Sequence, residues 1–177
     1  RQVRYYWKRS VRKWASPYLE QWERVKRWYT KVKEVELNIH QVNGVPIVEQ
    51  EDYLYIFFLN LYHLKDWIKV FTNDKDIEKI FSRTEGSKNL KIVADFVTNI
   101  KHFENSKTTR IDSNTYFVSR DANVFIGGQN HVANQANKSP VHTWWIQSNN
   151  ERLNVYTLAH DAFNEVKAYL IEQNLIE

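Results

Sequence analysis

The run YLYIFFLNLYHL at residues 53–64 constrains the fold more than any other stretch, because it is apolar on nearly every side of a helix. A helix with this pattern has to be surrounded by other elements. It is also too short to span a bilayer. We therefore expect a central helix over residues 49–71, opened by the acidic residues Glu49, Glu51 and Asp52, which suit a helix N-terminus.

The last turns of this helix carry Lys65, Asp66 and Lys69, which suggests that their side faces water. The opposite side is then predicted to face the core, and it carries Ile56, Leu59, Asn60, His63, Trp67 and Val70. On that side His63 is expected to be buried, neutral and hydrogen-bonded, either as a structural core histidine or as part of a site with Asp66.

The first segment of the chain shows a long helical stripe, because apolar residues recur every three or four positions from Val3 to Val32. Ser16 and Pro17 interrupt the stripe, and serine before proline is typical of a helix start. The expected elements are helices at 3–15 and 17–38 and a turn at 43–46.

Positive charge is concentrated in the same segment. The net charge of the chain is +4, whereas residues 1–33 carry eleven Lys and Arg against two Glu. Such a segment could follow the phosphates of a nucleic acid, or it could be an ordinary solvated helix face. Its four tryptophans are likewise open to two interpretations, an interface with a partner or packing within the chain. They are Trp7, Trp14, Trp22 and Trp28.

The rest of the chain predicts an α+β protein that is mostly helical, an antiparallel bundle of four to five helices with a small antiparallel sheet inserted before the C-terminal helix. At 177 residues we expect a single domain. Short β-branched and aromatic runs indicate three to five strands. The expected segments are helices at 74–83, 87–104 and 157–175, strands within 108–156, and a long polar connection at 127–139. Within the single domain we distinguish a basic aromatic helical segment at 1–40, core helices at 49–104, the small sheet at 108–156 and the C-terminal helix at 157–175.

The stretch ADFVTNIKHFE places Asp95, Asn99 and His102 at spacings of four and three, so on a helix they form one polar line. This line coincides with the side that an amphipathic helix shows to water, which is the simpler interpretation. It is a site only if another element covers it, and His63 with Asp66 could do so from the central helix.

Several chemistries are excluded. The chain has no cysteine, so disulfides and thiolate metal sites are impossible. It contains no phosphate loop, nucleophile elbow or dinucleotide fingerprint, and we expect no cofactor; whether a metal binds is left open. No secretory leader or membrane span is recognisable, which favours a soluble, cytoplasmic protein.

The motifs YHLKDWI at 62–68 and DFVTNIKHF at 95–103 resemble a pattern of uncharacterised bacterial helical proteins, a His-Leu-x-Asp-Trp helix followed by an Asn-x-x-Lys-His helix. Those proteins are similar in turn to the HEPN superfamily, helical bundles that commonly dimerise and often cut RNA. The Arg-x4–6-His signature of HEPN nucleases is missing, since Arg152 and His160 have seven residues between them.

The resemblance implies a domain that binds or cleaves RNA and forms a homo-oligomer. Its candidate catalytic residues would be His102 as general acid or base, Lys101 to neutralise phosphate, Asn99 to orient the substrate, and His63 beside them. The alternative is a non-catalytic module that dimerises or docks a partner through the aromatic N-terminal helix.

Overall fold

The computed structural model describes residues 16–37, 46–101, 116–123, 141–148 and 150–177. Within these ranges the chain forms five helices and three strands. The predicted α+β fold, a helical bundle with a small antiparallel sheet before the last helix, is confirmed. The elements are α1 (Pro17–Glu36), α3 (Ile47–Thr72), α4 (Ile77–Ile80), α5 (Lys88–Lys101), β1 (Tyr116–Asn123), β2 (Val141–Ser148), β3 (Glu151–Asn154) and α6 (Val155–Glu172).

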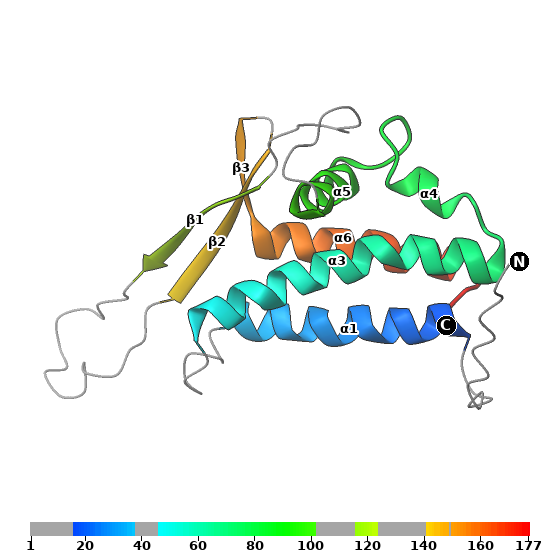
Figure 1. Ribbon diagram of the computed structural model, residues 1–177, viewed down its shortest axis with the longest axis horizontal. Helices are drawn as coiled ribbons and strands as arrows, with labels where there is room; N and C mark the ends of the chain where they lie inside the picture. Colours follow the sequence, from blue (N-terminus) through cyan, green and yellow to red (C-terminus); the bar gives the residue numbers. More distant parts are fainter. Residues whose placement is uncertain (1–15, 38–45, 102–115, 124–140, 149) are drawn as a thin grey trace, which may run out of the picture.

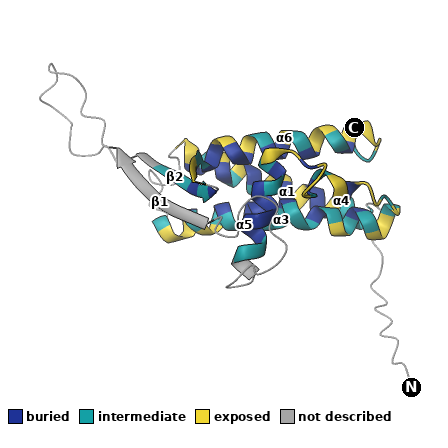
Figure 2. Cartoon of the chain, turned by 90° about the horizontal axis from the view of Figure 1, so that it is seen from above, coloured by how far each residue is buried: buried dark blue, intermediate teal, exposed yellow. Residues whose placement is uncertain are grey.

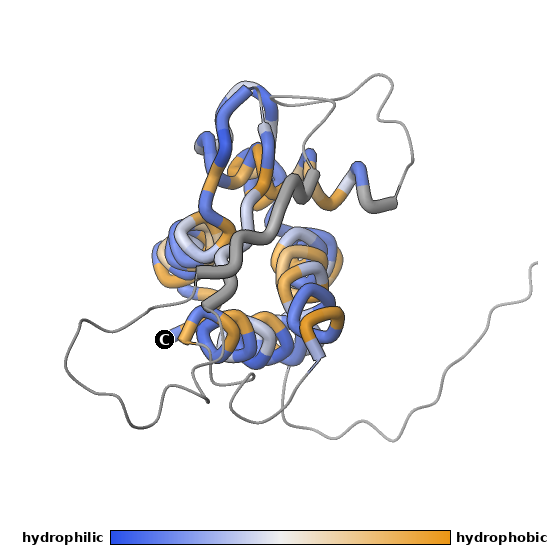
Figure 3. Tube along the Cα trace, turned by 90° about the vertical axis from the view of Figure 1, so that its left-hand side faces the viewer, coloured by the Kyte–Doolittle hydropathy of each residue, from blue (hydrophilic) through white to orange (hydrophobic). Residues whose placement is uncertain are grey.

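Helices α1, α3 and α6 lie side by side along the long axis of the molecule, and α5 packs across α3 and α6 (Figure 1). Helix α1 runs antiparallel to α6. The start of α1 lies beside the end of α6, where the hydroxyl of Tyr18 donates to the carbonyl of Leu175 just beyond that helix. Seen along the long axis, hydrophobic and hydrophilic residues alternate on each helix, which is the amphipathic pattern of a bundle (Figure 3).

The three strands form one antiparallel sheet in the order β1-β2-β3 at one end of the bundle. The register of β2 and β3 pairs Trp145 with Asn154 and Ser148 with Glu151. Asn150 lies in the turn between them with a φ of 62°, a left-handed conformation that asparagine tolerates better than most residues. The side chain of Asn154 then caps α6 by accepting from two backbone amides, so β3 leads directly into the last helix.

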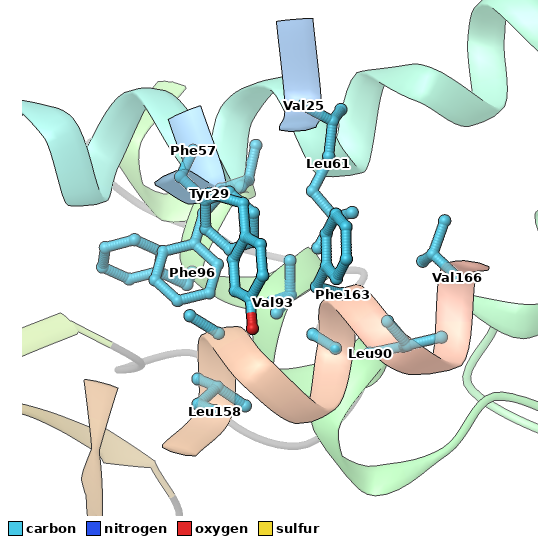
Figure 4. Close-up of a cluster of buried hydrophobic side chains, with 14 of the residues drawn as sticks. Val25, Tyr29, Phe57, Leu61, Leu90, Val93, Phe96, Leu158, Phe163 and Val166 are labelled. Atoms are coloured by element: carbon cyan, nitrogen blue, oxygen red, sulfur yellow. The ribbon is translucent and has the colours of Figure 1, made fainter. Parts of the chain in front are cut away.

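The core lies where α1, α3, α5 and α6 meet (Figure 4). Its centre is a stack of aromatic rings, with the centroid of Tyr29 4.0 Å from that of Phe163, and Trp22 on Phe163 at 5.1 Å. Phe96 of α5 stacks on Tyr55 and meets the edge of Phe58 on α3. Figure 2 shows the buried residues gathered along the inner sides of these helices.

Two of the expected helices, 17–38 and 49–71, match α1 and α3 to within two residues at each end. Helix α4 is shorter than the expected 74–83, because only Ile77–Ile80 is helical. The expected helix at 3–15 and the connection at 127–139 lie outside the described residues.

The predicted core side of α3 is wrong. Val70 is 72% exposed, and the side chain of His63 is 30% exposed, whereas the side chain of Lys65 is only 13% exposed. The buried residues of α3 are Gln50, Leu54, Phe57, Phe58, Leu61, Leu64 and Ile68. A helix whose middle is apolar all round does not itself indicate which side is buried, and contacts with the neighbouring helices decide it.

The expectation that the polar line of the 87–104 helix faces water is also wrong at Asp95. This residue is 0% exposed, and so are its neighbours Ala94 and Val97. Burial therefore extends well around this part of α5, because the helix contacts both α3 and α6. Val93, Phe96 and Val97 of the same helix are buried as well.

Candidate functional site on the α1–α3 face

The candidate site lies on the side of α3 that was expected to be buried. Asn60, His63 and Trp67 follow one another at spacings of three and four, so they share one side of the helix, and all three are half-buried. Gln21 and Arg24 of α1 border this side. We call these five residues, together with Asp66, the α1–α3 face.

A chain of hydrogen bonds joins the two helices at one edge of this face. Gln21 is 3% exposed, and its Nε2 donates to the side-chain Oδ1 of Asn60 at 3.0 Å and to the Asn60 carbonyl at 3.2 Å. Asn60 Nδ2 in turn donates to the Ile56 carbonyl at 2.7 Å. Arg24 Nη1 donates to Gln21 Oε1 at 3.1 Å. The amide of Gln21 thus has both ends occupied, which fixes the orientation of Asn60 relative to α1.

His63 and Asp66 form a pair one helical turn apart. His63 Nδ1 lies 3.1 Å from Asp66 Oδ2, and Lys65 Nζ donates to Asp66 Oδ1 at 2.7 Å. Partial burial by itself would raise the pKa of Asp66, but the hydrogen bonds from Lys65 and His63 outweigh it and hold the pKa below its usual value. Asp66 is therefore ionised at neutral pH. A carboxylate beside Nδ1 favours the tautomer with the proton on Nδ1, so Nε2 can accept a proton.

Two aromatic residues, Trp67 and Phe71, follow His63 along α3. The guanidinium carbon of Arg24 lies 5.8 Å from the ring centroid of Trp67, and Trp67 stacks on Phe71 at 5.9 Å and 20°. Arg24 thus reaches Asn60 through Gln21 and also reaches Trp67 directly. His63 lies between those two residues along α3, so a guanidinium, an imidazole and an indole gather on one surface.

The structure brings only part of the predicted site together. His63 is joined to Asp66, and its ring contacts Tyr62 of the same helix. Asn99 lies on α5 with its Oδ1 buried. The side chain of Lys101 and the whole of His102 lie outside the described residues, so their roles stay predictions. Within the described ranges, no three His, Asp or Glu side chains gather as a metal site would require.

Gln21 and Arg24 are not among the site residues expected from the sequence. Both sit on a helix where they look like ordinary polar positions, and their partners Asn60 and Trp67 are about forty residues away in the chain. Trp67 shares one side of α3 with Asn60 and His63, as expected, but it is half-buried and not part of the core. Only the pairing of α1 with α3 reveals that these residues share a surface.

The fold and this face define a mostly helical α+β protein with a histidine–carboxylate pair on its surface. Comparisons with protein-family models, curated proteins and solved structures give no match for the chain. In the described part of the chain, no helix combines the length and apolarity needed to cross a membrane.

Proposed function

We propose that the α1–α3 face binds RNA and that His63, oriented by Asp66, is the acid–base group of an RNA-cleaving site. The observation that carries this proposal is the His63–Asp66 pair next to Arg24 and Trp67. Further support comes from the resemblance of residues 62–68 to helical proteins similar to the HEPN superfamily. Residues 1–15, directly before α1, add six Lys and Arg and no acidic residue.

The chemistry is a transesterification within the RNA. His63 Nε2 removes the proton of a 2′-hydroxyl, whose oxygen attacks the adjacent phosphorus. The bond to the 5′-oxygen breaks, and that oxygen takes a proton from solvent water, which leaves a 2′,3′-cyclic phosphate and a free 5′-hydroxyl. Arg24 suits the phosphate, because a guanidinium binds phosphate oxygens in a fork and keeps its charge. The rings of Trp67 and Phe71 provide a surface on which a base can stack.

Binding is tested first, by fluorescence anisotropy of a labelled single-stranded RNA of mixed sequence at low and high salt. Arg24→Gln should weaken binding and flatten its salt dependence, because one phosphate contact is lost. Trp67→Ala should reduce the free energy of RNA binding by about 1–3 kcal/mol, because the surface on which a base stacks is removed. Lys69→Gln is the matched control, since it removes one positive charge from α3 at a residue that is paired with Glu78.

Cleavage is tested by following the same RNA on denaturing gels and analysing the ends of the products. His63→Gln should abolish the cyclic phosphate product while leaving RNA affinity largely unchanged. His160→Gln, which alters a histidine on another helix, is the control. Absence of RNA binding by the parent protein would overturn the whole proposal. Binding without cleavage would remove the catalytic step and leave the RNA-binding role.

A dimerisation or docking module is the second candidate, and the exposure of Val70 (72%) and Phe71 (50%) favours it. The tryptophans that first suggested this role divide into two groups. Trp22 stacks on Phe163 and Trp28 contacts Tyr53, so both serve packing within the chain. Trp7 and Trp14 lie outside the described residues. Light scattering tests the dimer: a monomer at concentrations of tens of micromolar, on the order where weak specific dimers form, would count against it.

A further inference from the structure

A second cluster of ionisable groups lies away from the α1–α3 face, where the C-terminal end of α1 meets the N-terminal end of α6. It surrounds a pocket of about 660 Å³, within the size range of small-molecule sites. Helical spacing brings both sets of lining residues to one side of their helices. The main lining residues are Tyr29, Lys33 and Glu36 from α1 and Tyr156, His160 and Asn164 from α6. We call this site the α1–α6 pocket.

Two buried phenols form its floor. Tyr29 and Tyr156 are 8% and 6% exposed, and burial, followed by the nearby Glu36 carboxylate, raises the pKa of each phenol above its usual value. Both therefore stay protonated at neutral pH. Figure 4 shows the Tyr29 hydroxyl directed toward α6, where its oxygen lies 2.5 Å from His160 Nδ1. When the phenol donates to Nδ1, the neutral imidazole carries its proton on Nε2, and this exposed residue then offers an N–H to a ligand.

Two exposed side chains of opposite charge, Lys33 and Glu36, line the pocket. Lys33 Nζ lies 5.0 Å from the Tyr29 ring centroid, and Glu36 sits one turn further along α1. Among the described residues neither has an ion-pair partner, although they carry opposite charges. Elsewhere on the same helix such charges do pair, Lys26 with Glu23 at 2.6 Å and Lys31 with Glu34 at 2.6 Å.

We propose that the α1–α6 pocket binds a small zwitterion of the α-amino-acid type. Lys33 and the Nε2–H of His160 bind its carboxylate, and Glu36 binds its ammonium group. Residues three apart on a helix have Cβ atoms about 5–6 Å from each other, a separation that allows one ligand to bridge both charges. Leu37, which is 70% exposed at the rim, and the ring of Tyr156 offer apolar contact to the ligand side chain.

The ligand is tested by isothermal titration calorimetry on the full chain. A pool of the twenty common amino acids is titrated first, followed by L-phenylalanine, N-acetyl-L-phenylalanine and L-phenylalaninamide. Free amino acids should bind, and the two blocked forms, each lacking one charge, should bind at least tenfold more weakly. No heat from the pool would overturn the proposal. Equal binding of the free and N-acetylated forms would also overturn it, because the pocket would then be a simple anion site.

Variants test which residues hold the two charges. Glu36→Gln should weaken binding of the free amino acid at least tenfold, so that it binds no better than the N-acetyl form. Lys33→Gln should also weaken binding of the free amino acid at least tenfold, so that it binds no better than the amide. Lys31→Gln and Glu34→Gln are matched controls, because they alter a paired lysine and glutamate on the same helix. Equal losses in the controls would place the binding elsewhere and refute the assignment. Melting curves of all four variants check that the fold is intact.

Discussion

Gly86 lies in the connection between α4 and α5, where the chain allows no side chain. A Cβ placed on it would be 2.6 Å from the backbone oxygen of Ile80 and 2.7 Å from that of Ser82. Its own N–H donates to the same Ser82 oxygen at 3.1 Å, which keeps the backbone close to it. The next residue, Ser87, caps α5 and donates to Glu165 of α6, so a shift here would be transmitted to the contact between two helices.

The predicted perturbation is Gly86→Ala. Ordinary van der Waals contact begins near 3.4 Å, so both carbonyl contacts are too short, and backbone atoms cannot swing away as the end of a flexible side chain can. Overpacking of this kind costs about 1–3 kcal/mol. For a domain of this size each kcal/mol shifts the melting temperature by about 2–4 °C, so we expect a fall of roughly 2–12 °C.

Circular dichroism melts of the parent, Gly86→Ala and Glu85→Ala measure this effect. Glu85 is the neighbouring exposed residue, and its replacement should shift the melting temperature little. A melting temperature of Gly86→Ala equal to that of the parent would show that the connection relaxes freely, and the close approach of the two carbonyls would then carry no energetic weight.

Three further predictions concern side-chain placement and pH. Ile68→Ala, at a fully buried site of α3, should lower the free energy of unfolding by about 2–5 kcal/mol, whereas Val70→Ala, at a 72% exposed site, should change it by no more than about 0.5 kcal/mol. Equal urea midpoints of the two variants would contradict the observed orientation of α3. The lowered pKa of Asp66 contributes stability that is present above its usual pKa of 3.8 and is lost as pH falls through the pKa of the folded state, so the stability gap between parent and Asp66→Asn should close in acid; a constant gap from pH 6 to pH 2 would disprove this. Burial, with the Glu51 carboxylate, raises the pKa of Tyr55 to about 12, so the stability it contributes is present below pH 10 and lost as pH rises toward 12; ultraviolet titrations of parent and Tyr55→Phe should differ by one late-ionising phenol, and identical curves would exclude it.

The sequence predicted the secondary structure well where periodicity and end signals agree. Pro17 begins α1 as expected from its fixed φ, and the apolar repeat through Trp22, Val25, Tyr29 and Val32 is the buried side of that helix. These signals are local, because a helix satisfies its backbone hydrogen bonds within itself. The strands around the turn at Asn150 follow from the same kind of local pattern.

The same local signals misassigned the sides of two helices. In α3 the charged residues near Asp66 predict the solvent side, but Lys65 is largely covered, whereas Val70 is exposed. In α5 the polar Asp95 was expected in water and is fully buried. A helix that is apolar all round, or one that lies between two neighbours, gives no local signal for its buried side, since burial depends on what packs against it.

The chain by itself therefore determined the fold class, the bounds of the long helices and the apolar stripe of α1. Only the tertiary structure decided which ionisable groups meet. Tyr29 and His160 are separated by 131 positions, and Gln21 and Asn60 by 39, yet each pair is within hydrogen-bonding distance. Periodicity reports on neighbours within about one helical turn. Both candidate sites arise between helices, where the packing of α1 against α3 and α6 sets the distances.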